Sequence, residues 1–127
     1  MAMGTTYDTG ALLAAEANRR ELWVLHARSL LRGERPVVPA AVLAQAWRGG
    51  PQAALSRLLG GCRIEDLDEP RARAAGNVCA RAGTRDIVDA TVVAGALARA
   101  DLVVTSDVED LERISSALGA SIHCHRI

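Results

Sequence analysis

The chain has 127 residues, half of them hydrophobic, and its 15 arginines balance 15 acidic residues to a formal net charge of zero. That length and apolar content suffice for a hydrophobic core without disulfides or a structural metal, and zero net charge excludes a strong overall field for nonspecific nucleic-acid binding. The absence of a run of about 18 apolar residues, of a signal-peptide pattern and of CxxC spacing predicts a cytoplasmic, reduced protein without a membrane segment.

Strand-like and helix-like segments alternate along the first half of the chain. Short apolar runs predict strands, and apolar residues at helical spacing predict helices, with Pro39 at a position that a helix start tolerates. In chain order the predicted elements are a strand at 5–8, one broken or two successive helices at 10–33, a strand at 37–38, and helices at 39–47 and 52–60.

The second half repeats this alternation. Its predicted elements are a strand at 62–67, a helix from Pro70 to near Gly83, a helix at 88–99, a strand at 102–106, a helix at 108–119 and a strand at 120–127. The apolar run at 102–106 is typical of a parallel strand that is buried on both faces. Such alternation indicates an α/β fold with a central parallel sheet, and no linker or repeat divides residues 1–127 into two domains.

Aspartates stand at the starts of several predicted helices. Asp86 with Asp89, and Asp107 with Asp110, have the spacing of an N-cap and an acidic third helical residue, and Asp8 precedes the helix that begins near residue 10. Carboxylates at helix starts also interact favourably with the helix dipole, by about 0.3–1 kcal/mol each. Helix capping therefore explains each aspartate taken singly.

Their combination supports a second interpretation. Asp8 and Asp107 each follow a predicted strand, and in an open parallel sheet ligands bind beyond the carboxyl ends of the strands. Carboxylates that converge there repel one another unless a cation neutralises them, and oxygen ligands without Cys or His select Mg2+ or Mn2+. Such a site suits metal-dependent cleavage of a phosphodiester. Whether Asp89 joins Asp8 and Asp107 depends on helix packing.

The order of these pieces resembles a PIN domain, and in particular the ribonuclease toxins of VapBC toxin–antitoxin systems. YDTGALLA resembles the family's first strand with its metal-binding Asp8, and PAAVLAQAW resembles the helix that usually carries a second acidic residue. DIVDATVVAGAL resembles the helix with Asp89, and VVTSDVEDL the strand end with Asp107. The resemblance covers essentially the whole chain.

This resemblance implies a three-layer α/β/α PIN domain over residues 1–127 that hydrolyses RNA with Mg2+, for which Mn2+ is a substitute. It also implies a homodimer and a cognate VapB-like antitoxin that holds the enzyme inactive. Asp8, Asp89 and Asp107 would be the catalytic residues and the metal ligands.

One position departs from the family pattern. Gln45 stands where the family usually has Glu, so the chain keeps a carbonyl oxygen there but loses a negative charge. Asp86 and Asp110 lie one helical turn from Asp89 and Asp107, and either is a candidate for the missing carboxylate. The candidates for a second shell around the metal are Gln45, Asp86, Asp110, Thr105 and Ser106. The hydroxyl groups of Thr105 and Ser106 could bind a phosphate or orient a carboxylate ligand.

Two other functions stay open or are disfavoured. Gln45 and the zero net charge are also compatible with a catalytically weak PIN-fold binding module. Phosphoryl transfer of the haloacid-dehalogenase kind is disfavoured because YDTG lacks a second aspartate and the chain has no lysine.

Trp23 and Trp47 are expected to be core or interface anchors, against which an antitoxin helix would dock.

Overall fold

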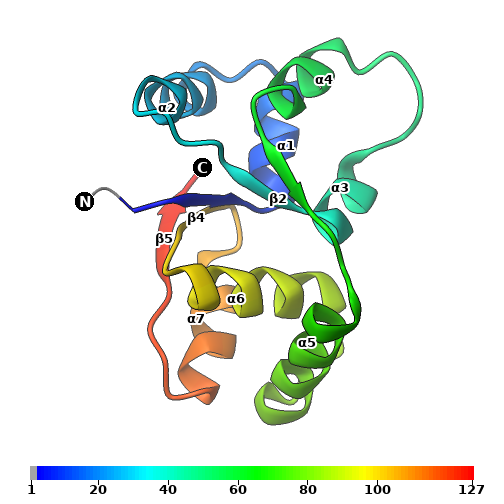
Figure 1. The fold of residues 1–127 in the computed structure, drawn as a ribbon, viewed down its shortest axis with the longest axis vertical. Helices are drawn as coiled ribbons and strands as arrows, with labels where there is room; N and C mark the ends of the chain where they lie inside the picture. Colours follow the sequence, from blue (N-terminus) through cyan, green and yellow to red (C-terminus); the bar gives the residue numbers. More distant parts are fainter. Residues whose placement is uncertain (1–2) are drawn as a thin grey trace.

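A computed structural model describes residues 3–127, in which seven helices cover a five-stranded parallel sheet of order β3-β2-β1-β4-β5 (Figure 1). The strands are β1 (Thr5–Tyr7), β2 (Val37–Pro39), β3 (Arg63–Glu65), β4 (Leu102–Thr105) and β5 (His123–Arg126). The helices are α1 (Thr9–Glu16), α2 (Arg20–Leu31), α3 (Ala40–Ala46), α4 (Ala53–Leu59), α5 (Glu69–Ala82), α6 (Ile87–Arg99) and α7 (Val108–Ala117).

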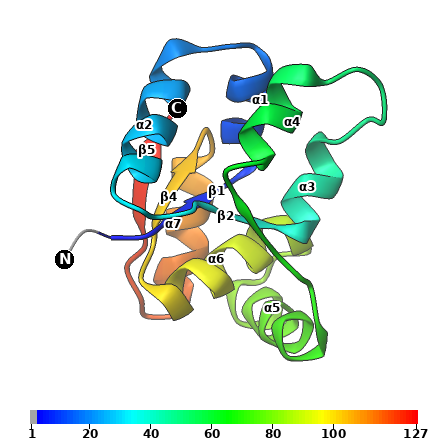
Figure 2. The same ribbon diagram turned by 45° about the horizontal axis from the view of Figure 1, so that its top comes forward.

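The helices form two layers, one on each face of the sheet. Figure 1 shows α1 to α4 above the strands and α5 to α7 below them. Figure 2 shows β5 beside α2, at the opposite edge of the sheet from the connection between α4 and α5. The predicted three-layer α/β/α fold with a central parallel sheet is therefore confirmed. None of the helices in residues 3–127 is long and apolar enough to cross a membrane.

The predicted elements all form, with differences at their ends. The segment 10–33 is two helices, because Asn18 adopts a left-handed conformation with φ of 57° between α1 and α2. Asn is one of the few residues that tolerate this region. Asp8 leaves the first strand and becomes the N-cap of α1, and the last strand is shortened to His123–Arg126.

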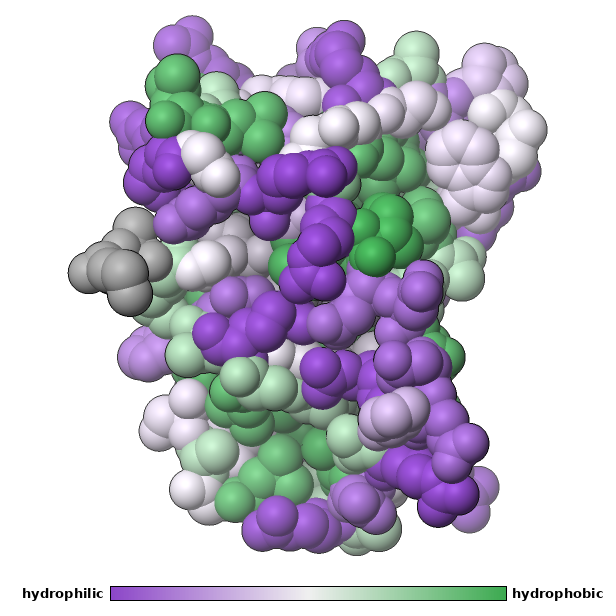
Figure 3. Space-filling view, in the orientation of Figure 1, coloured by the Kyte–Doolittle hydropathy of each residue, from purple (hydrophilic) through white to green (hydrophobic). Residues whose placement is uncertain are grey.

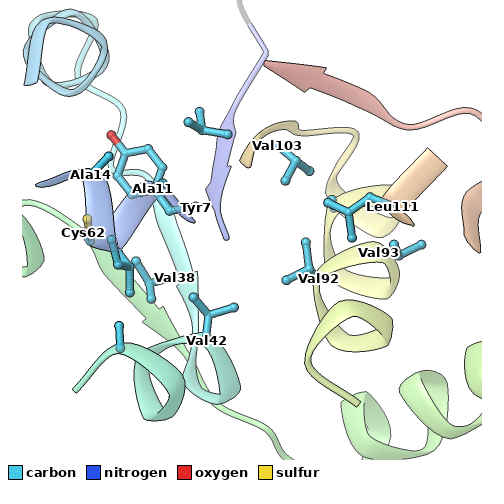
Figure 4. Close-up of a cluster of buried hydrophobic side chains, with 14 of the residues drawn as sticks. Tyr7, Ala11, Ala14, Val38, Val42, Cys62, Val92, Val93, Val103 and Leu111 are labelled. Carbon is cyan, nitrogen blue, oxygen red and sulfur yellow. The ribbon is translucent and has the colours of Figure 1, made fainter. Parts of the chain in front are cut away.

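The hydrophobic core lies on both faces of β1. Figure 4 shows Tyr7 and Ala11 on one side of the strand and Val92, Val103 and Leu111 on the other, and all five side chains are fully buried. Burial of a Val or Leu side chain contributes about 1.5–3 kcal/mol, so these two layers hold the short strands in place. A rigid sheet of this kind fixes where the strand ends lie.

Candidate active site

The carboxyl ends of β1 and β4 meet where the order of the strands reverses. From β1 the chain proceeds outward to β2 and β3, whereas β4 and β5 lie on the other side of β1. A reversal of this kind leaves a crevice beyond the strand ends, which is where open parallel sheets bind ligands. Asp8 directly follows β1 and Asp107 lies two residues beyond the end of β4, so both aspartates belong to this crevice.

Asp8 is held in the crevice by hydrogen bonds. It is only 2% exposed, and its carboxylate accepts hydrogen bonds from the Thr105 hydroxyl at 2.7 Å and the Thr9 backbone N–H at 2.8 Å. The Thr105 hydroxyl in turn accepts from the Asp107 backbone N–H at 2.9 Å. One hydroxyl group thus ties the buried carboxylate of Asp8 to the backbone that carries Asp107.

The aspartates differ in how far capping accounts for them. Asp86 caps α6, because its Oδ1 accepts from the Asp89 backbone N–H at 2.9 Å. Asp107 is the N-cap of α7 by position, but its side chain makes no capping hydrogen bond. Asp107 and Asp110 therefore take the predicted N-cap and third helical positions, but without a capping hydrogen bond from the Asp107 side chain.

Asp89 is half-buried and is affected by the charges of other aspartates. Burial raises the pKa of its carboxyl from 3.8 to about 7, and the charge of Asp86 is the next cause. The charges of Asp8, Asp107 and Asp110 raise it further. Each of these causes penalises the ionised form of Asp89, and none of the causes is a cationic side chain that would offset them.

The pKa of Asp8 reflects opposing effects. Burial raises it above its ordinary value, and the hydrogen bonds from Thr105 and Thr9 partly reverse that change. The charges of Asp107 and Asp86 raise it again. Asp8, Asp86, Asp89 and Asp107 thus share one electrostatic environment, although they come from segments far apart in the sequence.

The aspartate oxygens of the crevice suit Mg2+ by their chemistry, but their present arrangement is not that of a formed metal site. They are oxygen ligands with excess negative charge, as hard cations require. Among residues 3–127, however, no three His, Cys, Asp or Glu side chains are grouped closely enough to hold one metal ion. Asp8 is held by two hydrogen bonds, whereas the carboxylates of Asp89 and Asp107 accept no hydrogen bond from any described residue.

Gln45 reaches this site through a contact that the sequence did not predict. It lies near the end of α3, and its Oε1 accepts from the Thr9 hydroxyl at 2.5 Å. Thr9 follows Asp8, so Gln45 is tethered one residue from the buried carboxylate. α3 also packs against α6, the helix that carries Asp89.

Gly10 lets α1 approach the segment that carries Asp107. A Cβ atom at Gly10 would lie 2.9 Å from the Ser106 backbone nitrogen, closer than real Cβ atoms come. We expect Gly10→Ala to lower the free energy of unfolding by about 1–3 kcal/mol through overpacking, measured by urea denaturation. Gly76→Ala is the matched control, because a Cβ there meets nothing within 4 Å and should leave stability unchanged or slightly higher. Equal stability of the two variants would show that the close approach is unimportant.

The other chemically notable side chains lie elsewhere. His125 pairs with Glu21 at 3.2 Å on the far edge of the sheet, and His26 is buried against the Tyr7 hydroxyl at 2.9 Å. Asp110 forms an exposed ion pair with Arg113 at 3.9 Å, while still adding to the charge felt by Asp89. The histidines are therefore structural or surface residues, and the crevice depends on its carboxylates.

Comparison with known proteins gives a result at the level of structure. No protein-family model matches the chain, and no curated protein matches its sequence. The structure of DNA-bound VapBC2 from Rickettsia felis contains a chain with a TM-score of 0.72 and 15% identity, over 98% of this chain and 99% of that one.

Two further structures match over nearly their full length. A chain of DNA-bound VapBC from Salmonella typhimurium has a TM-score of 0.69 and 21% identity, over 98% of both chains. A chain of VapBC-1 from nontypeable Haemophilus influenzae has a TM-score of 0.68 and 18% identity, also over 98% of both. The protein thus has the PIN-like α/β fold found in the structures of VapBC toxin–antitoxin complexes.

Proposed function

We propose that the protein is a Mg2+-dependent endoribonuclease and the toxin of a type II toxin–antitoxin system. The observation that carries this proposal is the electrostatic coupling of Asp8, Asp89 and Asp107 at the strand reversal, where the charges of Asp8 and Asp107 both raise the pKa of Asp89. Carboxylates that repel one another in this way cost stability in the absence of a cation, and a metal site would give that cost a reason. The likeness to VapBC structures supports the same function.

Each carboxylate has a distinct role in this proposal. Asp8 is the fixed ligand, since Thr105 and Thr9 orient its two oxygens. Asp89 and Asp107 are the adjustable ligands, and the raised pKa of Asp89 makes it the group whose ionisation depends most on the cation. The bound Mg2+ would lower the pKa of a coordinated water and stabilise negative charge on the scissile phosphate.

Metal dependence of RNA cleavage tests the activity. Purified protein, freed of its antitoxin, should cleave a structured RNA in Mg2+ or Mn2+ and lose that activity in EDTA. Cleavage that persists in EDTA would exclude the metal mechanism. No cleavage under any condition, with RNAs of several classes, would exclude the nuclease.

A catalytically weak binding module is the second candidate. The absence of a preformed three-ligand group among residues 3–127 favours it, as does Gln45 in place of an acidic residue. The two candidates differ in their response to metal: ligand binding to the folded state raises Tm, so Mg2+ should stabilise the nuclease but not the module.

An apolar groove is the surface we propose for the antitoxin. It lies between α3 and α4, encloses about 380 Å³ and is lined by Ala40, Leu43, Ala44, Trp47 and Leu59. Figure 3 shows apolar side chains gathered where α4 approaches β3 and α3. Trp47 is 41% exposed, and exposed aromatic residues beside a pocket are common binding anchors. The apolar face of a helix would fill this groove.

We expect Trp47→Arg to weaken antitoxin binding about tenfold or more, because it removes an aromatic anchor and adds a charge. The measurement is calorimetric titration with the small protein encoded beside this gene. Leu31→Arg is the matched control, since Leu31 is 87% exposed on α2, outside the groove. Equal weakening by both variants would reject the groove as the docking site.

A further inference from the structure

Gln45 has one polar group occupied and the other free. Its Oε1 accepts from the Thr9 hydroxyl, while its Nε2 donates to no described residue, and the side chain is exposed at the edge of the crevice. Thr9 is the first residue of α1, so no earlier carbonyl of that helix competes for its hydroxyl. The Thr9 hydroxyl is therefore available to hold the Gln45 amide.

This contact sets the orientation of the amide. Oε1 faces Thr9, because it accepts a hydrogen bond from the Thr9 hydroxyl at 2.5 Å, within the range of an O–H···O hydrogen bond. The two N–H donors of Nε2 are left for another acceptor. This is the reverse of what a metal ligand requires, because a ligand must present its oxygen.

The charges around the crevice indicate what the free N–H groups of Gln45 could bind. A phosphodiester that approaches Asp8, Asp89 and Asp107 meets carboxylates of its own sign. A neutral amide beside Asp8 adds no further repulsion and offers two N–H groups to an anionic oxygen. A glutamate at the same position would add another negative charge and remove both donors.

We propose that Gln45 is a substrate-binding residue, whose amide N–H groups donate to a phosphate oxygen of the RNA strand while the Thr9 hydroxyl holds its Oε1. This inference rests on the proposed nuclease function. It makes Thr9 a positioning residue that acts through Gln45, and it leaves the metal to the three aspartates.

The test separates metal binding from substrate binding in the same variants. Mn2+ affinity is measured by calorimetry without RNA, and KM and kcat are measured by cleavage of a fluorescent RNA. We expect Gln45→Ala to raise KM about tenfold and to leave Mn2+ affinity within about twofold of the wild type. Gln45→Glu should raise KM at least as much and bind Mn2+ more tightly.

Thr9 variants test the tether. Thr9→Val removes the hydroxyl and should raise KM in the same direction as Gln45→Ala, whereas Thr9→Ser retains the hydroxyl and should behave as wild type. Adding Thr9→Val to Gln45→Ala should raise KM no further, because both act through one amide.

Three results would overturn the inference. A tenfold or greater loss of Mn2+ affinity in Gln45→Ala would make Gln45 a metal ligand, and an unchanged KM would make it a surface residue without a role in binding. Wild-type protein that does not cleave RNA would reject the nuclease first and this inference with it. That failure is visible before any variant is compared.

Discussion

Replacing Asp89 by Asn is expected to lower kcat for RNA cleavage about 100-fold or more. The substitution keeps the shape of the side chain and removes one charge from the proposed metal site. Metal stabilisation of a transition state amounts to several kcal/mol, and each loss of about 1.4 kcal/mol lowers the rate tenfold. The rate is measured with saturating RNA in Mg2+.

Asp66→Asn is the matched control for this experiment. Asp66 is exposed and lies outside the crevice, so its substitution removes the same charge without touching the proposed site. It should retain wild-type kcat. If Asp89→Asn is as active as Asp66→Asn, Asp89 is not a metal ligand. Its role would then be that of an acidic residue in the first turn of α6.

The second large effect is on stability. The pKa of Asp89 is raised from 3.8 to about 7 in the folded protein, so between these values the folded state binds a proton that the unfolded state has lost. Stability therefore falls as pH rises from about 4 to about 7, and the penalty is complete above pH 7. Asp89→Asn lacks this penalty and should be the more stable protein at pH 8.

The expected size of this stabilisation is about 1–2 kcal/mol after allowance for solvent screening, or roughly 4–8 °C in Tm. Differential scanning calorimetry in EDTA at pH 8 and pH 4.5 measures it, and the difference between variant and wild type should shrink at the lower pH. Added Mg2+ should stabilise the wild type alone. A variant that is less stable than wild type at pH 8 would contradict the crowding of charge.

The outline of the site could be predicted from the sequence because it follows from backbone rules. Strands and helices alternate, the sheet is parallel, and residues just beyond strand ends, such as Asp8 and Asp107, face a common crevice. The family resemblance added Asp89, whose pKa is raised by the charges of both residues.

The details that decide the chemistry depend on tertiary contacts. Thr9 and Gln45 are separated by 36 positions, and the sequence of neither segment predicts that their side chains form a hydrogen bond. From the sequence, Gly10 is an ordinary turn residue. Its close approach to Ser106 is known only from the structure. Asp107 takes the N-cap position that the spacing predicts, but its side chain makes no capping hydrogen bond, because that bond depends on the backbone conformation at Asp107 as well as on residue type.

Calorimetric titration of Mn2+ into the wild type, Asp89→Asn and Asp66→Asn tests the central claim most directly, because it needs neither the RNA target nor the antitoxin. The wild type and Asp66→Asn should bind the metal, and Asp89→Asn should bind it at least about tenfold more weakly. Absence of binding to the wild type, or equal binding to all three proteins, would contradict the claim that these aspartates form a metal site.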